Sequence, residues 1–132
     1  MDLHLVWAAL IGAVLGSLAD WLFAGVLFHS RYQLHPEVWR PGAGAVRSRI
    51  VLAQALALVT SAAFVALAWK TRETELMPAL KLAAMIWLIG PLPLLLANGL
   101  FIKIDPLVTA SHAAGWLVKL LLIAAATAWM LG

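Results

Sequence analysis

The chain has 132 residues, of which 64% are hydrophobic and 11% are charged. Because soluble domains carry about 25% charged residues, this composition excludes an ordinary soluble domain and indicates an integral membrane protein. The sequence contains no cysteine, which excludes disulfides, thiolate metal sites and iron–sulfur clusters. The net charge is +3, and the basic residues lie mainly in loops, which does not fit a nucleic-acid-binding surface.

Four apolar runs are each long enough to cross about 30 Å of hydrocarbon, which takes about 20 helical residues. They cover residues 5–28, 50–69, 80–101 and 108–130. Backbone polar groups in lipid must be satisfied within their own segment, so each run is predicted to be a helix. The predicted fold is all-α: a polytopic membrane protein in which an antiparallel four-transmembrane-helix bundle, with an interfacial first loop, forms one domain over residues 1–132.

The first run places Gly12, Gly16 and Asp20 four residues apart, so they lie near one face of the predicted helix. Small residues at this spacing let another helix approach closely. Asp20 is the only acidic residue inside any predicted span. A carboxylate at that depth indicates either a functional site or a buried ion pair.

The loop at residues 29–49 is rich in arginine and carries a single acid, Glu37. We expect it to contact membrane lipids, including anionic headgroups. Pro36 and Glu37 are suited to open a short interfacial helix, which the glycine- and proline-rich residues 41–44 would end. The basic residues of this loop and Lys103 outnumber those of the opposite side by a small margin. The positive-inside rule therefore predicts that the loop is cytoplasmic, and a dual or inverted topology stays open.

Two prolines mark the later spans. Gly90-Pro91-Leu92-Pro93 lies inside the third run, where each proline removes a backbone donor and disturbs the preceding turn. We expect a kink there, either as a packing bend or as a gating hinge. Pro106 is predicted to begin the fourth helix.

Every predicted span carries a polar stripe at heptad spacing, which keeps its members near one face. These candidate ligand-binding residues are Asp20 in the first span, Gln54 and Ser61 in the second, Asn98 in the third, and His112 and Lys119 in the fourth. Facing inward, they would form a polar funnel in the bundle. Its mouth would lie on the side of the first loop, at His29, Arg31 and His35.

Lys119 lies near the middle of the fourth span, where its side chain reaches only part of the way to an interface. A pair with Asp20 would neutralise both charges. Such a pair either fixes the helix register or belongs to a proton or ligand site, and both interpretations stay open. His112 is expected to hydrogen-bond with Asn98 or Gln54 at the same depth.

Sequence motifs do not support an enzyme, because no phosphate-binding glycine loop, Ser/His/Asp arrangement or carboxylate pair occurs. No metal site is predicted, since the spacing between His29 and His35 matches no metal motif. No cofactor is predicted either. Haem would need axial imidazoles, and nothing in the sequence fixes the separation of His29 and His112.

Three stretches carry a family resemblance. They are residues 16–39, with Trp21, Leu27, Phe28 and Trp39; Trp87-Leu88-Ile89-Gly90-Pro91 with Asn98-Gly99-Leu100-Phe101; and Ala113-Ala114-Gly115-Trp116-Leu117-Val118. They resemble the domain-of-unknown-function family 1761 of small bacterial membrane proteins, although Trp116-Leu117 stand where that family usually has Tyr-His. The resemblance implies a multi-pass, four-helix protein of the bacterial inner (cytoplasmic) membrane and supplies no activity.

Two main classes of function fit these features. The first is a carrier or binder of a small solute or ion, working as a homodimer through the glycine face of the first helix. Its plan is similar to that of small multidrug-resistance transporters, which is an analogy. The alternative is a non-catalytic accessory or scaffold protein that binds lipid, quinone or a partner helix, which seven tryptophans suit. A lipid-modifying enzyme using His29, His35 or His112 is the least favoured.

Overall fold

The computed structural model describes residues 2–40, 42 and 47–132, and over these residues the chain is helical with no strand. This confirms the prediction of an all-α chain. Among the described residues, four helical segments are long and apolar enough to cross a membrane. They are Leu3–Leu27, Arg47–Thr71, Leu76–Phe101 and Pro106–Leu131.

The first segment changes its helical form halfway along. It begins as α1 (Leu3–Asp20), which Asp2 caps by accepting a hydrogen bond from the backbone N–H of His4. Directly after Asp20 the chain continues as the wider π-helix η1 (Trp21–Leu27). The apolar run predicted one regular helix here, because hydropathy does not distinguish the two forms. Wider turns of this kind are frequent at functional sites.

Two short helices follow the first segment. α2 (His29–Gln33) was not predicted, whereas η2 (Pro36–Val38) confirms the short helix that Pro36 was expected to open. The predicted end of this helix falls on residues 41–44, of which only Gly42 is described. Gly42 has a φ of 66°, which glycine adopts without strain.

The remaining helices are α3 (Arg47–Thr71), α4 (Leu76–Ile89), α5 (Pro91–Phe101) and α6 (Pro106–Leu131). The third span is interrupted at Gly90, as its prolines predicted, because α4 ends there and Pro91 opens α5. Pro106 begins α6 as expected. Asp105 caps α6 by accepting a hydrogen bond of 2.7 Å from the backbone N–H of Leu107.

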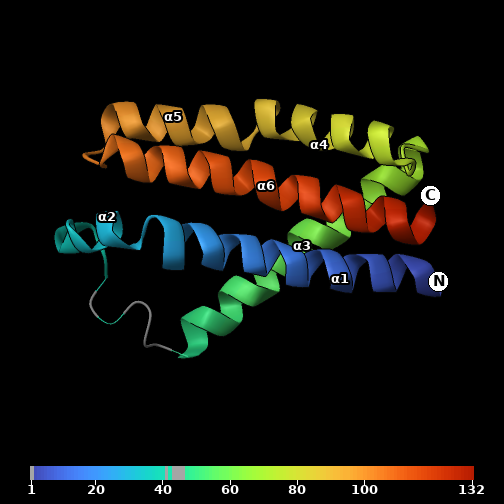
Figure 1. The fold of residues 1–132 in the computed structure, drawn as a ribbon, viewed down its shortest axis with the longest axis horizontal. Coiled ribbons are helices and arrows are strands. Elements are labelled where there is room, and N and C mark those ends of the chain that lie inside the picture. The colour runs from blue at the N-terminus through green and yellow to red at the C-terminus, as the bar shows by residue number, and fades with distance from the viewer. Residues whose placement is uncertain (1, 41, 43–46) are drawn as a thin grey trace.

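Helix α6 lies at the centre of the molecule (Figure 1). It packs against α1 on one side and against α4 and α5 on the other, while α3 crosses α1 obliquely. The main buried cluster joins α3, α4 and α6 and consists of Phe64, Ala68, Ala79, Ala83, Leu120, Ile123 and Ala124. Small alanines in this cluster let the helices approach closely.

The glycine face of α1 is buried within this chain. A Cβ atom added at Gly12 would collide with the Ser61 hydroxyl of α3, and one added at Gly16 would lie 3.1 Å from the Lys119 Cγ atom of α6. The predicted close approach to this face is therefore confirmed. Because its partners are α3 and α6, this face gives no support to a homodimer.

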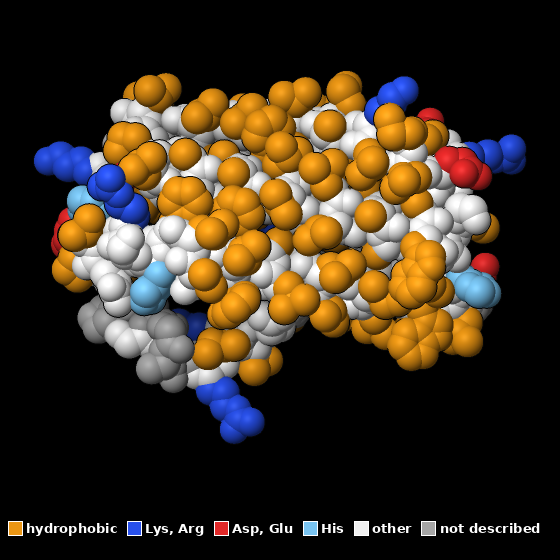
Figure 2. All heavy atoms as spheres, viewed as in Figure 1, with side chains coloured by type: hydrophobic (Ala, Val, Ile, Leu, Met, Phe, Trp, Pro, Cys, Tyr) orange, Lys and Arg blue, Asp and Glu red, His pale blue; other side chains and the backbone are white. Residues whose placement is uncertain are grey.

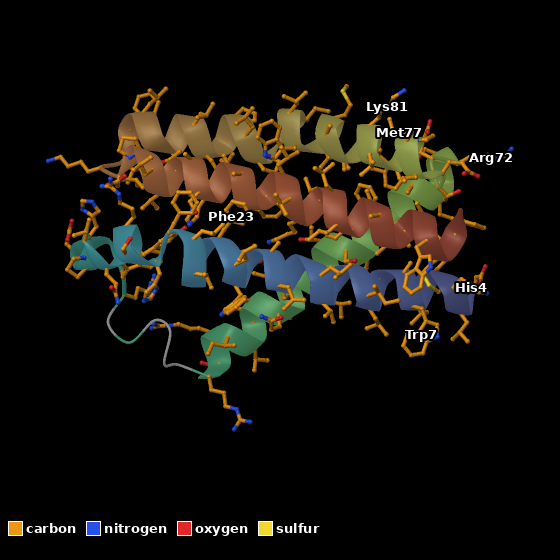
Figure 3. The ribbon with its side chains drawn as sticks, in the orientation of Figure 1. His4, Trp7, Phe23, Arg72, Met77 and Lys81 are labelled. Atoms are coloured by element: carbon orange, nitrogen blue, oxygen red, sulfur yellow. The ribbon has the colours of Figure 1, made fainter. Side chains whose placement is uncertain are left out.

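The outer surface separates apolar from charged side chains. In Figure 2, hydrophobic side chains cover the middle of the visible face, and most of its charged side chains lie toward the two ends. Figure 3 places His4 and Trp7 of α1 at the same end as Arg72, Met77 and Lys81. Exposed apolar residues over the length of the helices suit a lipid environment.

Candidate functional site

An ion pair joins α1 to α6 in the interior of the bundle. The Lys119 Nζ atom lies 2.7 Å from the Asp20 Oδ2 atom, so the predicted contact is present. The ammonium group also lies 4.3 Å from the centroid of the Trp116 ring, which adds a cation–π interaction. The two side chains differ in exposure, since Lys119 is 8% exposed and Asp20 is 50% exposed. One part of the Asp20 carboxylate is thus left free of the lysine.

The free side of Asp20 faces a cavity of about 240 Å³, which we call the inner chamber. Its walls come from α1, η1, α2 and α6 and consist of Asp20, Phe23, Ala24, Tyr32, Ser111, His112, Gly115 and Trp116. Phe23 reaches this wall because Gly115 has no side chain, and a Cβ atom there would lie 3.4 Å from the Phe23 Cγ atom. The chamber therefore combines one carboxylate with three aromatic side chains.

Two hydroxyl groups on the chamber wall are buried. The side-chain oxygens of Tyr32 and Ser111 have no hydrogen-bond partner among the described residues. Tyr32 is 8% exposed and Ser111 is fully buried. A buried polar group without a partner costs roughly 1–3 kcal/mol, so these hydroxyls favour a ligand that would bond to them. Burial raises the pKa of Tyr32, and a weak interaction with the Ser111 hydroxyl, which falls outside hydrogen-bond geometry, opposes that rise.

Tyr32 is held over the chamber by two neighbouring rings. Its ring centroid lies 5.1 Å from that of Trp39 and 5.5 Å from that of His112. The Trp39 indole N–H also donates a hydrogen bond of 3.1 Å to the backbone carbonyl of Tyr32. This packing attaches α2 to α6, so α2 forms part of the chamber wall.

A wider space of about 1110 Å³, the outer cavity, adjoins the inner chamber. It shares Ala24, Tyr32 and His112 with the chamber and is also lined by His29, Gln33, Pro36, Trp39, Arg40, Gly42 and Ala53. Tyr32 and His112 thus stand where the wide space meets the narrow one. Of the three residues predicted at the mouth, only His29 lines this cavity.

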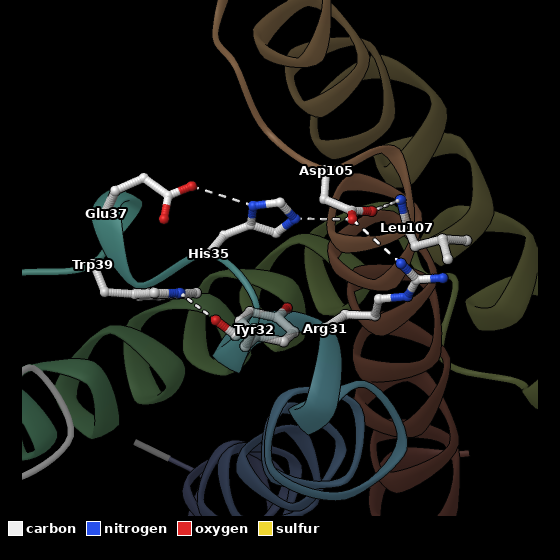
Figure 4. Close-up of polar contacts among 7 residues, drawn as sticks. All are labelled: Arg31, Tyr32, His35, Glu37, Trp39, Asp105 and Leu107. Carbon is white, nitrogen blue, oxygen red and sulfur yellow. Dashed lines mark hydrogen bonds and ion pairs between the residues drawn. The ribbon is translucent and has the colours of Figure 1, made fainter.

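The other two predicted mouth residues, Arg31 and His35, belong to a separate group that we call the loop cluster (Figure 4). The His35 Nε2 and Nδ1 atoms lie 3.1 Å from Asp105 and 3.2 Å from Glu37, respectively. The Arg31 Nη1 atom lies 3.6 Å from the same Asp105 oxygen. The loop cluster therefore fastens the segment after the first span to the start of α6.

These contacts shift the protonation of the loop cluster. The hydrogen bond to Asp105, followed by that to Glu37, raises the pKa of His35. The pKa of Asp105 is lowered, first by the hydrogen bond from the Leu107 backbone N–H and then by His35 and Arg31. Hydrogen bonding to its own backbone N–H, and then to His35, lowers the pKa of Glu37. All three shifts favour the charged forms that attract one another.

The structure separates Gln54, Ser61 and Asn98 from the chamber. Gln54 accepts a hydrogen bond of 2.6 Å from the Ser17 hydroxyl and so joins α3 to α1. Ser61 is buried against Gly12, and Asn98 is exposed on α5. His112 packs against the Tyr32 ring rather than pairing with Gln54 or Asn98, because α2 folds back over the start of α6. Spacing within a helix could not predict that long-range contact.

The chamber residues that sequence reasoning missed are Phe23, Ala24, Tyr32, Ser111 and Trp116. Two of them had a signal in the sequence, because Ser111 precedes His112 and Trp116 lies three residues before Lys119. Phe23 and Tyr32 depend on the π-helix and on the docking of α2. Over the part of the chain that the structure describes, no group of three or more His, Asp or Glu residues could hold a metal ion.

No protein-family model, curated protein or solved structure matches this chain. The resemblance to family 1761 therefore stays a prediction. The function has to be argued from the inner chamber and its surroundings.

Proposed function

We propose that this chain is a multi-pass integral membrane protein that binds a small solute in the inner chamber and carries it. In this proposal the spans form an antiparallel bundle in the bacterial cytoplasmic membrane, with the loop at residues 29–49 on the cytoplasmic side. Four helices of spanning length and their exposed apolar side chains support the membrane location. The excess of arginine in the first loop supports the orientation.

One observation carries the binding role. The half-exposed carboxylate of Asp20 shares a 240 Å³ cavity with the buried hydroxyls of Tyr32 and Ser111, which have no partner among the described residues. Polar groups that converge on a largely aromatic cavity are typical of ligand sites. A purely structural ion pair would not need a cavity on one side of its carboxylate.

The surroundings of the chamber support a carrier over a fixed binding protein. The outer cavity offers a route to the chamber past Tyr32 and His112. Two breaks in helix regularity lie at η1, directly after Asp20, and at Gly90. Such breaks are the positions at which a helix bends most readily.

Native mass spectrometry of the protein released from gentle detergent tests the binding role. We expect one discrete small-molecule adduct on the wild-type chain, whose mass identifies the ligand class. Ala24→Leu, which fills the wall that the inner chamber shares with the outer cavity, should lose that adduct. Ala55→Leu, an exposed alanine of α3, should keep it. A wild-type chain that carries no adduct would contradict the proposal, and uptake of the identified compound into proteoliposomes tests the carrier step.

A second observation favours the alternative, a non-catalytic accessory protein that binds lipid or a partner helix. A groove of about 430 Å³ lies between α1 and α3 and is lined by apolar side chains, among them Leu5, Leu10, Leu58 and Val65. This groove suits an acyl chain or another helix. Under this alternative, mass spectrometry would show heterogeneous lipid adducts, and Ala24→Leu would leave them unchanged.

A further inference from the structure

The electrostatics of the inner chamber favour an uncharged ligand. Asp20 supplies its one permanent negative charge, and the ammonium of Lys119 balances that charge at 2.7 Å. The other titratable side chains on its wall are Tyr32 and His112. An ion that entered would bring a charge with no counter-charge to a site whose carboxylate and ammonium already neutralise each other, which is unfavourable.

The polar groups of the chamber specify hydrogen bonds of both kinds. The Asp20 carboxylate is an acceptor and needs a donor on the ligand. The hydroxyls of Tyr32 and Ser111 can each donate, and neither has a partner among the residues that the structure describes. A ligand with a donor and an acceptor close together on one edge would satisfy the Asp20 carboxylate and these hydroxyls at the same time.

The remaining walls are aromatic. Phe23 and Trp116 line the chamber together with the Tyr32 ring, while the Lys119 ammonium already occupies a place over Trp116. Aromatic walls favour a ligand with a flat apolar face. The volume of about 240 Å³ corresponds to about eight water molecules. This space holds one substituted six-membered ring.

We infer that the inner chamber binds an uncharged ring compound that carries a hydrogen-bond donor and acceptor on one edge, as a primary aromatic amide does. The amide N–H would donate to Asp20, and the amide carbonyl would accept from the hydroxyls of Tyr32 or Ser111. The ring would lie against Phe23 and Trp116. This inference rests on the proposed function, because it assigns a ligand class to the same chamber.

Three probes of nearly identical shape separate charge from size. Para-fluorinated benzamide, benzamidinium and benzoate are neutral, cationic and anionic, and each is titrated with the full-length protein in detergent while ¹⁹F NMR reports binding. We expect benzamide to bind at least tenfold more tightly than either ion. Tyr32→Phe and Ser111→Ala, which each remove one hydroxyl, should weaken benzamide binding about five- to tenfold. Thr127→Val removes a buried hydroxyl of α6 that bonds to Ile123 and lies outside the chamber wall, so it should leave binding unchanged.

Other results would overturn the inference in distinguishable ways. Tighter binding of benzamidinium or benzoate, lost in Ala24→Leu, would overturn the neutral class while the chamber remained a binding site. Failure of all three probes, with the native adduct still present in the wild type and lost in Ala24→Leu, would overturn the ring-amide class alone. Failure of the probes together with absence of any adduct would overturn the inference and the proposed function. The assigned hydrogen bonds would be overturned if Tyr32→Phe and Ser111→Ala bound benzamide as tightly as the control variant Thr127→Val.

Discussion

Two groups of charges connect the first part of the chain to α6, and they do so in different surroundings. The pair of Asp20 and Lys119 lies within the helices of spanning length, with a lysine that is 8% exposed. The loop cluster lies outside the spans, where His35 and Arg31 are 37% and 45% exposed. The inner pair, with a buried Lys119 and a half-exposed Asp20, has one charge-to-charge contact, whereas Asp105 of the loop cluster shares its charge between two partners. Loss of a single charge should therefore matter far more inside the bundle than at its end.

The largest expected effect follows from the unequal exposure of the buried pair. Asp20→Asn leaves the Lys119 ammonium without a counter-charge in the interior, and we expect a loss of about 3 kcal/mol in the free energy of unfolding. Lys119→Met should cost less, because the Asp20 carboxylate keeps its access to the inner chamber. Reversible unfolding in mixed detergent micelles measures both values.

The double variant sharpens this prediction. Asp20→Asn combined with Lys119→Met removes both charges, so most of the lost stability should return if the pair acts only in folding. The ligand adduct should stay absent in this variant, since the Asp20 carboxylate is proposed to hold the ligand. A double variant that is as unstable as Asp20→Asn alone would contradict the charge-pair explanation.

A moderate effect is expected where α1 makes room for Lys119. Gly16→Ala places a methyl group 3.1 Å from the Lys119 Cγ atom, so the lysine stem has to shift. Overpacking costs about 1–3 kcal/mol, while alanine gains about 1 kcal/mol over glycine in helix propensity, so we expect a net loss of about 1 kcal/mol in the free energy of unfolding. Ala13→Ser, a change of similar size on the partly exposed part of α1, is the control. Equal stability of Gly16→Ala and the wild type would show that the crowding costs no more than the helix propensity that alanine gains over glycine, about 1 kcal/mol.

The buried pair could be predicted from sequence for a simple physical reason. Asp20 is the only acid within the spans, and Lys119 is the most deeply placed base, so mutual neutralisation left few alternatives. The helices and the break at Gly90 could be predicted equally well, since hydropathy and proline act locally. The chamber could not be predicted from sequence, because Tyr32 reaches it only through the docking of α2 on α6, and Phe23 only through the π-helix.

The loop cluster should make stability depend on pH. Its contacts raise the pKa of His35 above the unfolded value of about 6.5, so this stabilisation is complete below pH 6.5 and is lost as pH rises through the higher folded value. Asp105 and Glu37 have lowered pKa values, so their contribution is lost in strong acid instead. We expect the melting temperature to fall by a few degrees between pH 6 and pH 8.5.

Two histidine variants isolate the source of that pH dependence. His35→Gln removes the titrating group from the loop cluster, so its melting temperature should change less with pH than that of the wild type. His4→Gln removes a histidine at the other end of the bundle and should keep the wild-type profile. The same pH profile in His35→Gln and the wild type would contradict the assignment to His35.

The smallest expected effect is the response of the loop cluster to salt. Raising the ionic strength from 0.1 M to 1 M shortens the screening length from about 10 Å to about 3 Å, which weakens contacts between exposed charges. We expect a decrease of one or two degrees in the melting temperature at pH 6.

Asp105→Asn removes the charge that Arg31 and His35 share while asparagine can still cap α6, so this variant should lose part of the salt response. If Asp20→Asn abolished the salt response and Asp105→Asn did not, the buried pair would be the solvent-accessible one, and the contrast between the two groups of charges would be wrong.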